Sequence, residues 1–435
     1  MTQKQALLLA IFLVTYGLLF YFLIAMQLRL DFASFYSATL AYIEGSNPYK
    51  VLVANYFPTP MKLPPNLNPP FFLNLIQPFT KINYPLAAII WSLLSFVAGL
   101  AGSGIVFIIT FPGNYLAKNW LTLLFVYLAL YSTLMNTTIA QLGAILLFFI
   151  MSGYYFYLQK RDNLAGILWG IIAAIKLFPA LLFFLALTQK RYKVLFAMSL
   201  TGILTWLIPL YTYGKSIYSI YFDMLPRVFW YGDNWNASIY GFLFRLFVDP
   251  ANLFQNLFVV KTVYLILFFL SLVWYLQTIS RDKNKTSDHR AFCLTLVMML
   301  LMSPFGWMYY FSLLIMPMII TWQSIIAEKS PINTWARLWI FCLFLLDFPI
   351  GYVTATHMQT MFYKLSIFSC YFYGLLLLAY LLSRTPSTIS QQEASFGEKS
   401  SHLSQPIMFI LTFGLSVPLA AFLVRLMKMS FLGII

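Results

Sequence analysis

Residues 84–111 read YPLAAIIWSLLSFVAGLAGSGIVFIITF and contain no charged side chain. A helix needs about 20 consecutive, mostly apolar residues to cross the hydrocarbon core of a bilayer, so this run is long enough to span it. Similar runs recur along the chain. Those that predict further spans lie at about 6–28, 120–135, 139–158, 194–211, 253–279, 291–303, 308–322, 338–355, 361–382 and 406–426.

The composition of the 435-residue chain agrees with these runs. Hydrophobic residues make up 61% of it and charged residues 9%, whereas a soluble domain carries about 25% charged residues. Aromatic residues make up 19%, which suits lipid-facing helices and interfacial belts. The composition excludes a soluble enzyme, a disordered chain and a fibrous protein. We therefore predict an all-α polytopic membrane protein with about 11–12 transmembrane helices.

The charge balance has a topological meaning. The chain carries 27 Lys and Arg against 12 Asp and Glu, a net charge of +15. These basic residues stand in short runs between apolar segments, the pattern of cytoplasmic loops in membrane proteins. We therefore expect anionic membrane lipids rather than nucleic acid as partners. The histidines and cysteines form no metal-ligand spacing, so the sequence predicts no metal site and no cofactor, and leaves divalent-metal dependence open.

The segment 164–187 is long enough to span, but basic loops flank it at both ends, at 160–161 and 190–193. A single crossing would place one of these loops outside. Its centre reads Lys176-Leu-Phe-Pro179, and proline breaks a helix because it lacks a backbone donor and clashes with the preceding turn. The sequence therefore predicts a re-entrant helical hairpin that returns to the cytoplasmic side.

Two long polar segments are predicted on the outer side, at 29–83 and 211–235. The first is rich in proline and contains the amphipathic stretches 32–43 and 71–79, which favour interfacial helices. Residues 1–383 are predicted to form one transmembrane domain that includes both outer loops. Residues 384–405 are predicted to form a polar cytoplasmic linker, and residues 406–435 a C-terminal transmembrane helix.

Asp31 directly follows the first predicted span, in the sequence Arg29-Leu-Asp31-Phe-Ala-Ser-Phe-Tyr36. Asp is a preferred N-cap, so Asp31 fits the start of the helix expected from residue 32, with Arg29 as a candidate partner. It also fits a general base at the outer membrane interface, which would take the proton of an acceptor hydroxyl. The two interpretations are compatible.

Several short motifs follow one another over roughly residues 30–315. They are Asp31-Phe-x-x-Phe-Tyr36, Gly45-Ser-Asn47-Pro48-Tyr49, Asn68-Pro69-Pro70-Phe71, Gln141-Leu-Gly143, Ala173-Ala174-Ile-Lys176-Leu-Phe-Pro179, Asn236-Ala-Ser238-x-x-Gly241-x-x-x-Arg245 and Ser303-Pro304-Phe-Gly-Trp307-x-Tyr309-Tyr310. In this order they resemble glycosyltransferase family 87, which comprises membrane mannosyl- and arabinofuranosyl-type transferases of the GT-C fold. The last third of the chain carries little of the resemblance.

The resemblance implies a GT-C-like bundle and a hexosyltransferase that uses a polyprenyl-phosphate sugar. A mannose-like sugar would pass, with inversion, to a lipid-linked or glycan hydroxyl on the non-cytoplasmic side. It implies that Asp31 is the catalytic base. The residues expected to bind the donor phosphate or sugar are Arg245, Arg227, Asn236, Ser238, Tyr309 and Trp307. The residues expected to bind the acceptor are Tyr36, Asn47, Tyr49 and Asn68.

Two departures from the family pattern bear on the sugar and the acceptor. The family often has Tyr before the Pro-Pro pair, where this chain has Asn68, and often has His where it has Tyr309. A tyrosine there can act only as a hydrogen-bond partner. The outer carboxylates of Glu44, Asp223 and Asp233 are candidates to hold an acceptor or a metal, but we favour their interpretation as solvated loop charges.

The alternative function is that of a membrane transporter or a flippase for a lipid or polyprenyl phosphate. Such proteins favour ionisable residues near the midplane and paired interrupted helices. This chain has one interrupted segment and few midplane charges, so we favour a cell-envelope transferase. The expected location is multi-pass in a bacterial inner (plasma) membrane, with the active site on the periplasmic side. The expected partners are the donor, the acceptor and membrane lipids.

Overall fold

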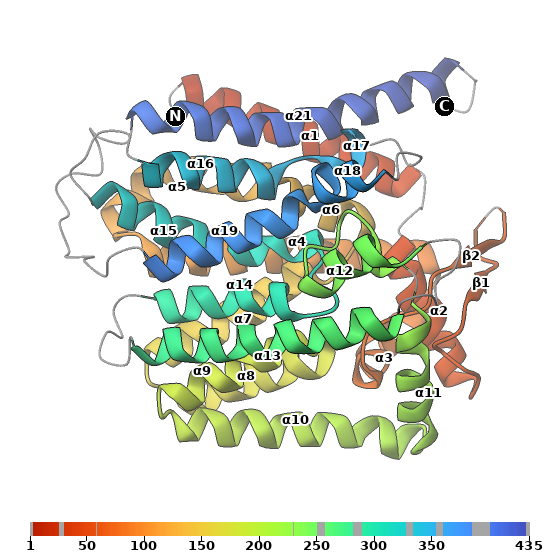
Figure 1. The fold of residues 1–435 in the computed structure, drawn as a ribbon. Helices are drawn as coiled ribbons and strands as arrows, with labels where there is room; N and C mark the ends of the chain where they lie inside the picture. Colours follow the sequence, from red (N-terminus) through yellow and green to blue (C-terminus); the bar gives the residue numbers. More distant parts are fainter. Residues whose placement is uncertain are drawn as a thin grey trace. The chain divides into compact units, whose positions relative to one another are not determined.

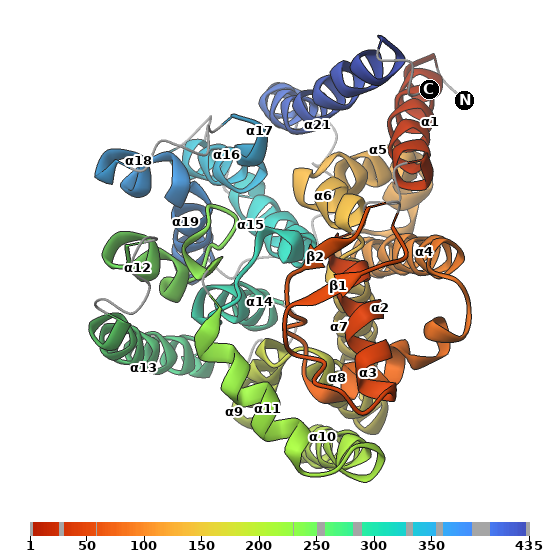
Figure 2. The same cartoon turned by 90° about the vertical axis from the view of Figure 1, so that its right-hand side faces the viewer.

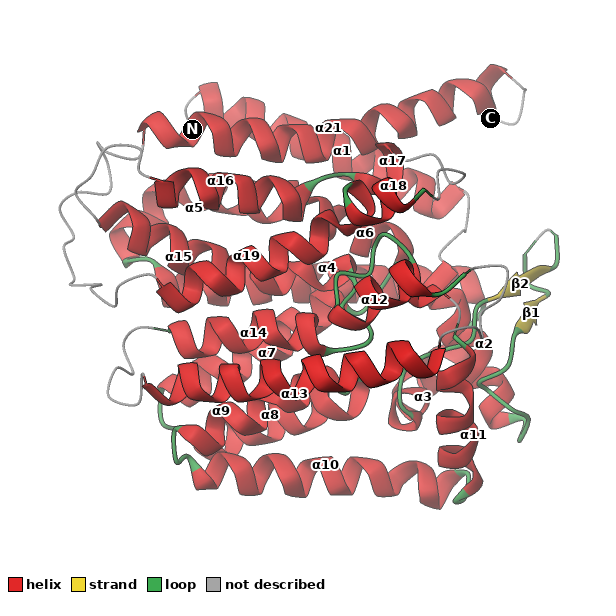
Figure 3. Cartoon of the chain, viewed as in Figure 1, coloured by secondary structure: helices red, strands yellow, loops and turns green. Residues whose placement is uncertain are grey.

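Helices dominate the computed structural model of the chain (Figure 3). The structure describes residues 3–25, 30–57, 59–228, 230–249, 257–281, 289–327, 334–353, 360–384 and 401–431. Within these ranges the strands are β1 (Leu52–Ala54) and β2 (Met61–Leu63), an antiparallel pair in which Val53 lies opposite Lys62. The prediction of an all-α polytopic membrane protein is confirmed.

The helices vary widely in length. The α-helices are α1 (Gln3–Ala25), α2 (Leu30–Ile43), α3 (Pro70–Ile76), α4 (Tyr84–Thr110), α5 (Gly113–Ala129), α6 (Tyr131–Ile139), α7 (Gly143–Leu158), α8 (Asp162–Ile175), α9 (Leu182–Thr188), α10 (Tyr192–Thr212), α11 (Ser216–Met224), α12 (Ile239–Phe247), α13 (Leu257–Arg281), α14 (Arg290–Met302), α15 (Ile315–Ala327), α16 (Thr334–Asp347), α17 (Ile350–Val353), α18 (Met361–Leu365), α19 (Cys370–Arg384) and α21 (Ser401–Phe431). The 3-10 helices are η1 (Gln77–Lys81), η2 (Phe178–Leu181), η3 (Leu225–Arg227), η4 (Trp230–Gly232), η5 (Met308–Leu314) and η6 (Ile367–Ser369).

Six helical segments in the described ranges are long and apolar enough to cross a membrane, or seven if the bent pair α5 and α6 forms one span. They include α4, α10 and α13. Other predicted spans coincide with shorter apolar helices, such as α7 and α14. The predicted linker 384–405 lies mostly outside the described residues, and α21 covers the predicted C-terminal span.

The chain divides into two compact units that alternate along the sequence. Unit 1 comprises Met1–Thr15, Thr110–Leu134 and Phe229–Ile435, and unit 2 comprises Tyr16–Ile109 and Met135–Val228. Residues 1–383, predicted as one domain, thus contribute to both units. The motif residues up to Arg227 that were predicted as site residues belong to unit 2, and those from Asn236 onward belong to unit 1.

In unit 2, the first predicted outer segment contains the helices expected from its amphipathic stretches. α2 covers 32–43, and α3 with η1 covers 71–79. α3 begins with Pro70, where the missing backbone N–H of proline has no cost because the first turn has no intrahelical acceptor for it. The β1–β2 hairpin, which packs against α2 (Figure 2), was not predicted. Each strand has only three residues and lies in a proline-rich loop, so the sequence shows no clear alternation of apolar and polar residues there.

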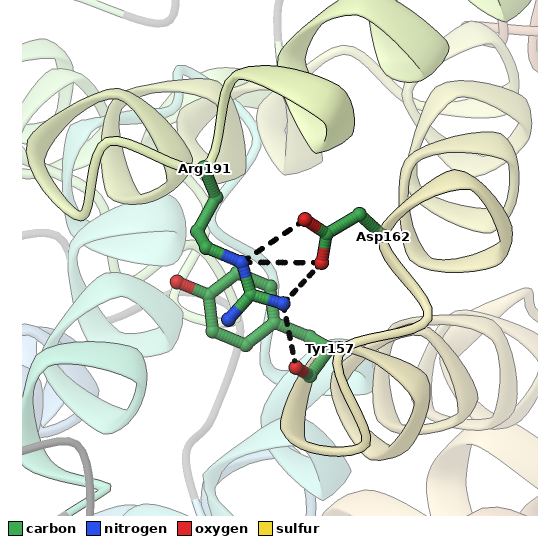
Figure 4. Close-up of polar contacts among 3 residues, drawn as sticks. All are labelled: Tyr157, Asp162 and Arg191. Atoms are coloured by element: carbon green, nitrogen blue, oxygen red, sulfur yellow. Dashed lines mark hydrogen bonds and ion pairs between the residues drawn. The ribbon is translucent and has the colours of Figure 1, made fainter.

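The segment 164–187 of unit 2, predicted to be re-entrant, turns back on itself. Arg191 forms an ion pair with Asp162, donates from Nη2 to the carbonyl of Tyr157 at 3.0 Å, and lies over the Tyr157 ring (Figure 4). The turn before α8 and the turn after α9 therefore lie side by side. A single straight helix over 164–187 would separate its ends by more than about 30 Å. The hairpin geometry is confirmed.

The break in the hairpin falls where the sequence predicts it. α8 ends at Ile175, Lys176 is extended (φ −140°, ψ 133°), and Pro179 lies in the first turn of η2. α8 packs along α10 (Figure 1). A Cβ at Gly166 would lie 2.5 Å from the carbonyl oxygen of Val194, so glycine permits this close approach. The packing fixes the hairpin, and with it the position of Lys176.

In unit 1, a buried carboxylate satisfies the backbone at the bend between α5 and α6. Asp347, which is 2% exposed, accepts a 2.7 Å hydrogen bond from the Tyr131 N–H. Tyr131 opens α6, where a helix leaves N–H groups without intrahelical partners. Nearby, α16, α19 and α21 pack together through their apolar faces.

Candidate functional site

Asp31 lies in the first turn of α2, where a negative charge interacts favourably with the helix dipole. The next residue, Phe32, is fully buried, and its ring stacks on those of Trp91 at 5.6 Å and Tyr84 at 6.0 Å. This aromatic packing fixes the start of α2, and with it the backbone of Asp31. Arg29, the partner considered for Asp31, lies outside the described residues.

Gln141 holds the Asp31 carboxylate directly. Its Nε2 donates to Asp31 Oδ2 at 2.6 Å, and its Oε1 accepts from the Leu142 N–H at 2.9 Å. The second contact fixes which end of the amide faces Asp31. The preceding residue, Ala140, has a left-handed backbone (φ 56°), and its carbonyl accepts from the Trp91 indole at 2.9 Å. The turn between α6 and α7 is thus anchored to the same aromatic cluster.

Lys176 is the second polar neighbour of Asp31. Its side chain is 5% exposed, and its charge interacts with that of the Asp31 carboxylate. Burial raises the pKa of Asp31 to about 6, while the Lys176 ammonium and the Gln141 hydrogen bond act in the opposite direction. Asp31 is therefore mostly ionised at neutral pH, with a proton affinity well suited to a general base.

The two neighbours of Asp31 were singled out in the sequence without this role. Gln141 belonged to a motif, and Lys176 was notable as a charge inside an apolar run. The charge of Lys176 acts on Asp31. The sequence signal for Lys176 is the proline break at Pro179, which interrupts the apolar segment that contains it.

The predicted acceptor residues lie in unit 2 and mostly organise the loop between α2 and α3. The Tyr36 hydroxyl donates to the Ile82 carbonyl at 2.8 Å, and the Tyr49 hydroxyl donates to the Asn68 carbonyl at 3.1 Å. Asn47 Oδ1 accepts from the Tyr49 N–H at 2.8 Å. These contacts shape the loop between α2 and α3.

Asn68 also has unused hydrogen-bonding capacity. Its Nδ2 donates to Asn66 Oδ1 at 2.8 Å, but Asn68 Oδ1 and Asn66 Nδ2 are buried and have no hydrogen-bond partner in the described part of the chain. Buried polar atoms without partners are rare and call for an explanation. One acceptor and one donor therefore remain for a polar ligand at this loop.

In unit 1, two of the sequence motifs meet. The Ala237 N–H donates to the Gly306 carbonyl at 2.8 Å, and Asn236 Nδ2 donates to the Pro304 carbonyl at 2.9 Å. Ser238 caps α12 by accepting from the Gly241 N–H at 2.9 Å. A Cβ at Gly306 would lie 2.0 Å from the Leu300 carbonyl oxygen. Asn236 and Ser238 thus build a rigid pair of loops.

Arg245 is buried, at 4% exposed, and its guanidinium is engaged by the protein. Nη1 donates to the carbonyls of Gly232 at 3.1 Å and Asp233 at 2.6 Å. Nη2 donates to the Asn236 carbonyl at 3.3 Å, and Nε donates to Ser369 Oγ at 3.2 Å. Four of its five N–H groups are therefore occupied. This geometry favours a residue that organises the loop over one that reaches out to a phosphate.

The remaining predicted donor residues differ in exposure. Trp307 is 7% exposed and stacks on Tyr310 at 6.1 Å, whereas Tyr309 is half-buried beside the Trp235 ring. Arg227 is exposed at the end of η3 in unit 2. Its guanidinium is accessible to a ligand.

Two further features of the described residues bear on ligands. No group of three His, Cys, Asp or Glu side chains placed to hold a metal ion occurs among them. Unit 1 contains an apolar cavity of about 200 Å³, whose lining includes Trp322, Trp339 and Leu130 together with Asp347. None of the predicted site residues lines this cavity.

Comparisons with known proteins place these motifs in a family. The model of glycosyltransferase family 87 matches residues 66–304, a region that includes Gln141, Lys176 and Arg245 but begins after Asp31. Searches of curated proteins and of solved structures give no match. The matched region covers more than half of the chain and includes the Asn236–Arg245 motif of unit 1, and it ends at Pro304, within the motif that faces it. The chain belongs to glycosyltransferase family 87 and is a membrane glycosyltransferase.

Proposed function

We propose that this glycosyltransferase moves a mannose-like sugar from a polyprenyl-phosphate donor to a hydroxyl of a lipid-linked or glycan acceptor. The reaction would invert the anomeric carbon, take place on the non-cytoplasmic side of a bacterial inner membrane, and use a GT-C-type bundle. The observation that carries the proposal is the desolvated carboxylate of Asp31, held by Gln141 at the start of α2.

Asp31 would act as the general base. As the acceptor oxygen attacks the anomeric carbon, its O–H bond breaks and the proton passes to Asp31. The bond between the anomeric carbon and the phosphate oxygen breaks at the same time, and the carrier phosphate leaves with the electron pair. A base with a pKa near the working pH combines a large ionised fraction with useful proton affinity. The value of about 6 for Asp31 supports this role.

The other site residues divide into binding and supporting roles in this proposal. Arg227 is exposed and offers a planar fork that matches a phosphate group. Trp307 and Tyr309 would contribute ring surface and a hydroxyl to the sugar. Asn236, Ser238 and Arg245 would position the loops that carry these rings, since their polar atoms contact protein groups.

The acceptor is proposed to bind along the loop between α2 and α3. Asn68 offers an unused acceptor oxygen there, next to the unused Nδ2 donor of Asn66. A sugar or polyol hydroxyl can donate to the first and accept from the second. Tyr36, Tyr49 and Asn47 would maintain the shape of this loop.

The experiment that tests the proposal uses purified full-length protein in lipid nanodiscs. It is incubated with a panel of polyprenyl-phosphate sugars and short lipid-linked or glycan acceptors. Release of carrier phosphate together with formation of a glycosylated acceptor supports the proposal, and Asp31→Asn should strongly reduce both. Transfer from a nucleotide sugar alone, or carrier movement across the bilayer without phosphate release, would overturn it.

A further inference from the structure

An apolar cavity of about 200 Å³ lies inside unit 1, and none of the predicted site residues lines it. Its walls come from α5, α15, α16 and α21. α16 packs against α15 and α21, and α21 packs against α5. The lining residues of α5 extend from Tyr115 to Leu130, the residue directly after the helix. Because an α-helix rises about 1.5 Å per residue, these positions mark about 22 Å of its length, which suits an extended chain.

The walls of the cavity are held together by hydrogen bonds and ring contacts. Trp339 Nε1 donates to the Met318 carbonyl at 3.1 Å, and the centre of its ring lies 4.6 Å from that of Trp322. Gln323 Nε2 donates to the Thr110 carbonyl at 2.9 Å and joins α15 to the residues before α5. The indole N–H of Trp339 is thus occupied, and its ring surface remains for an apolar ligand.

Asp347 is the charged residue in this lining. Its Oδ1 accepts from the Tyr131 N–H at 2.7 Å, whereas its Oδ2 is buried and has no hydrogen-bond partner among the described residues. Oδ2 faces α21, because a Cβ at Gly414 would lie 2.5 Å from it. Ile407 and Leu411, two turns and one turn before Gly414, line the cavity from the same face of α21. A buried polar atom without a partner calls for an explanation, and this one lies at the cavity wall.

The size and the lining of the cavity indicate what could satisfy this oxygen. Apolar cavities stay dry and take up apolar molecules, and since one water needs about 10–15 Å³ of such space, 200 Å³ accommodates roughly 13–20 groups of that size. A long hydrocarbon chain with one polar end fits this description. A hydroxyl end suits Asp347 in either form, because it can donate to the carboxylate and accept from the acid. A phosphate end would bring a second negative charge to the same place, which is unfavourable.

We propose that this cavity binds an uncharged long-chain alcohol, with its hydroxyl at Asp347 Oδ2 and its chain along α5 toward Tyr115. The alcohol would satisfy the buried oxygen and fill the apolar space beside Trp322 and Trp339. The site goes beyond the proposed transfer reaction, because its carboxyl group disfavours the phosphate that the proposed donor carries. Neither inference depends on the other.

The test uses the full-length protein in lipid nanodiscs and hexadecanol with a photoreactive diazirine in its chain. After irradiation, peptide mapping should place the label on α5 and α15. Unlabelled hexadecanol should compete fully, whereas hexadecane should compete about tenfold or more weakly, because the hydrogen bond to a charged group is lost. Competition by hexadecane at the strength of hexadecanol, or labelling that is no stronger on α5 and α15 than on the exposed face of α13, would overturn the proposal.

Asp347→Asn tests the polar end of the site. Asn keeps the Oδ1 acceptor for the Tyr131 N–H but removes the negative charge. Hexadecyl phosphate should therefore fail to compete in the wild type and should compete in Asp347→Asn. Competition by hexadecyl phosphate in the wild type at the strength of hexadecanol would overturn the proposal, since the cavity would then fit a lipid phosphate.

Val126→Phe tests the part of the cavity that would hold the chain, because Val126 lines it. The added ring takes up the space of the chain, so labelling should fall roughly tenfold or more. The matched control is Val273→Phe, at a 52% exposed valine of α13 in the same unit, which should label like the wild type. Hexadecanol should raise the melting temperature of the wild type and of Val273→Phe, but not that of Val126→Phe.

Wild-type labelling in a Val126→Phe protein that melts normally would contradict the site. The competition of hexadecanol, hexadecane and hexadecyl phosphate for the wild type decides the proposal even if Val126→Phe does not fold.

Discussion

Gln141 Nε2 donates to Asp31 Oδ2 at 2.6 Å, across 110 residues of sequence. The Gln141 amide is itself fixed by the Leu142 N–H. A carboxylate held in this way presents its other oxygen, Oδ1, in a defined direction. The hydrogen bond thus connects the start of α2 to the turn between α6 and α7, and both parts hold the carboxylate that we propose as the base.

Replacing Gln141 with Leu should reduce kcat by roughly tenfold or more, because a hydrogen bond to a charged group contributes about 1.5–3 kcal/mol. The KM for the donor should change little, since Gln141 contacts the base. Steady-state kinetics with the best donor measures both values. A wild-type kcat in a properly folded Gln141→Leu protein contradicts this role.

Replacing Asp31 with Asn should lower turnover by roughly 10²–10⁴, the usual contribution of a general base. Asn keeps the size of Asp and still offers a side-chain oxygen to the Gln141 amide, so insertion and donor binding should persist. Asp223→Asn, at an exposed carboxylate of the same unit, serves as the matched control and should remain active. Single-turnover transfer assays compare the rates of the two variants with that of the wild type. Near-wild-type turnover in Asp31→Asn would exclude Asp31 as the base.

The activity of the wild type should depend on pH through Asp31. The carboxylate is the active form, and burial raises its pKa to about 6. We therefore expect kcat/KM to be level above this pH and to fall about tenfold per pH unit below it. An ordinary aspartate would lose activity only below about pH 4. A kcat/KM profile that stays level down to pH 4 would show that burial does not raise the pKa of the catalytic base.

Replacing Arg245 with Ala should destabilise unit 1, because it leaves three carbonyls and the Ser369 hydroxyl without their donor. The expected loss is on the order of 2–4 kcal/mol, seen as a lower melting temperature. Arg245→Lys should recover only part of it, since lysine lacks the planar fork. Arg227→Ala, at an exposed arginine, should leave the melting temperature unchanged. If Arg245→Ala instead melts normally and raises the donor KM, Arg245 contacts the phosphate.

Replacing Gly306 with Ala should prevent the two unit 1 motifs from packing. The added Cβ would meet the rigid backbone of Leu300 at 2.0 Å, a distance that no rotamer change can relieve. Gly113→Ala, in the same unit, has nothing within 4 Å of the added carbon and is the matched control. Expression and melting temperature should fall for Gly306→Ala alone. Equal behaviour of the two variants would contradict the packing seen around Gly306.

The elements that the sequence predicts well are those set by local chemistry. The apolar run at 84–111 forms α4, and Pro179 breaks the segment that contains Lys176 as expected. The amphipathic stretch after Asp31 forms α2. Each of these depends on residues close in sequence, so periodicity and proline chemistry suffice.

The contacts within the candidate site could not be predicted in the same way. The neighbours of Asp31 are Gln141 and Lys176, which tertiary packing alone brings near. Arg245 was assigned to a phosphate because an arginine in a motif suggests an anion. Its carbonyl acceptors at 232, 233 and 236 come from a loop whose path the sequence does not specify.

The alternation of the two units along the chain has a consequence for biogenesis. Unit 2 has all of its residues once position 228 has left the ribosome, whereas the segment 110–134 must wait for partners that begin at 229. Since domains tend to fold as units during synthesis, this segment stays exposed to chaperones and quality control after all residues of unit 2 have been made. Ribosome arrest at successive positions should therefore give protease-resistant 16–109 and 135–228 before 110–134 becomes protected.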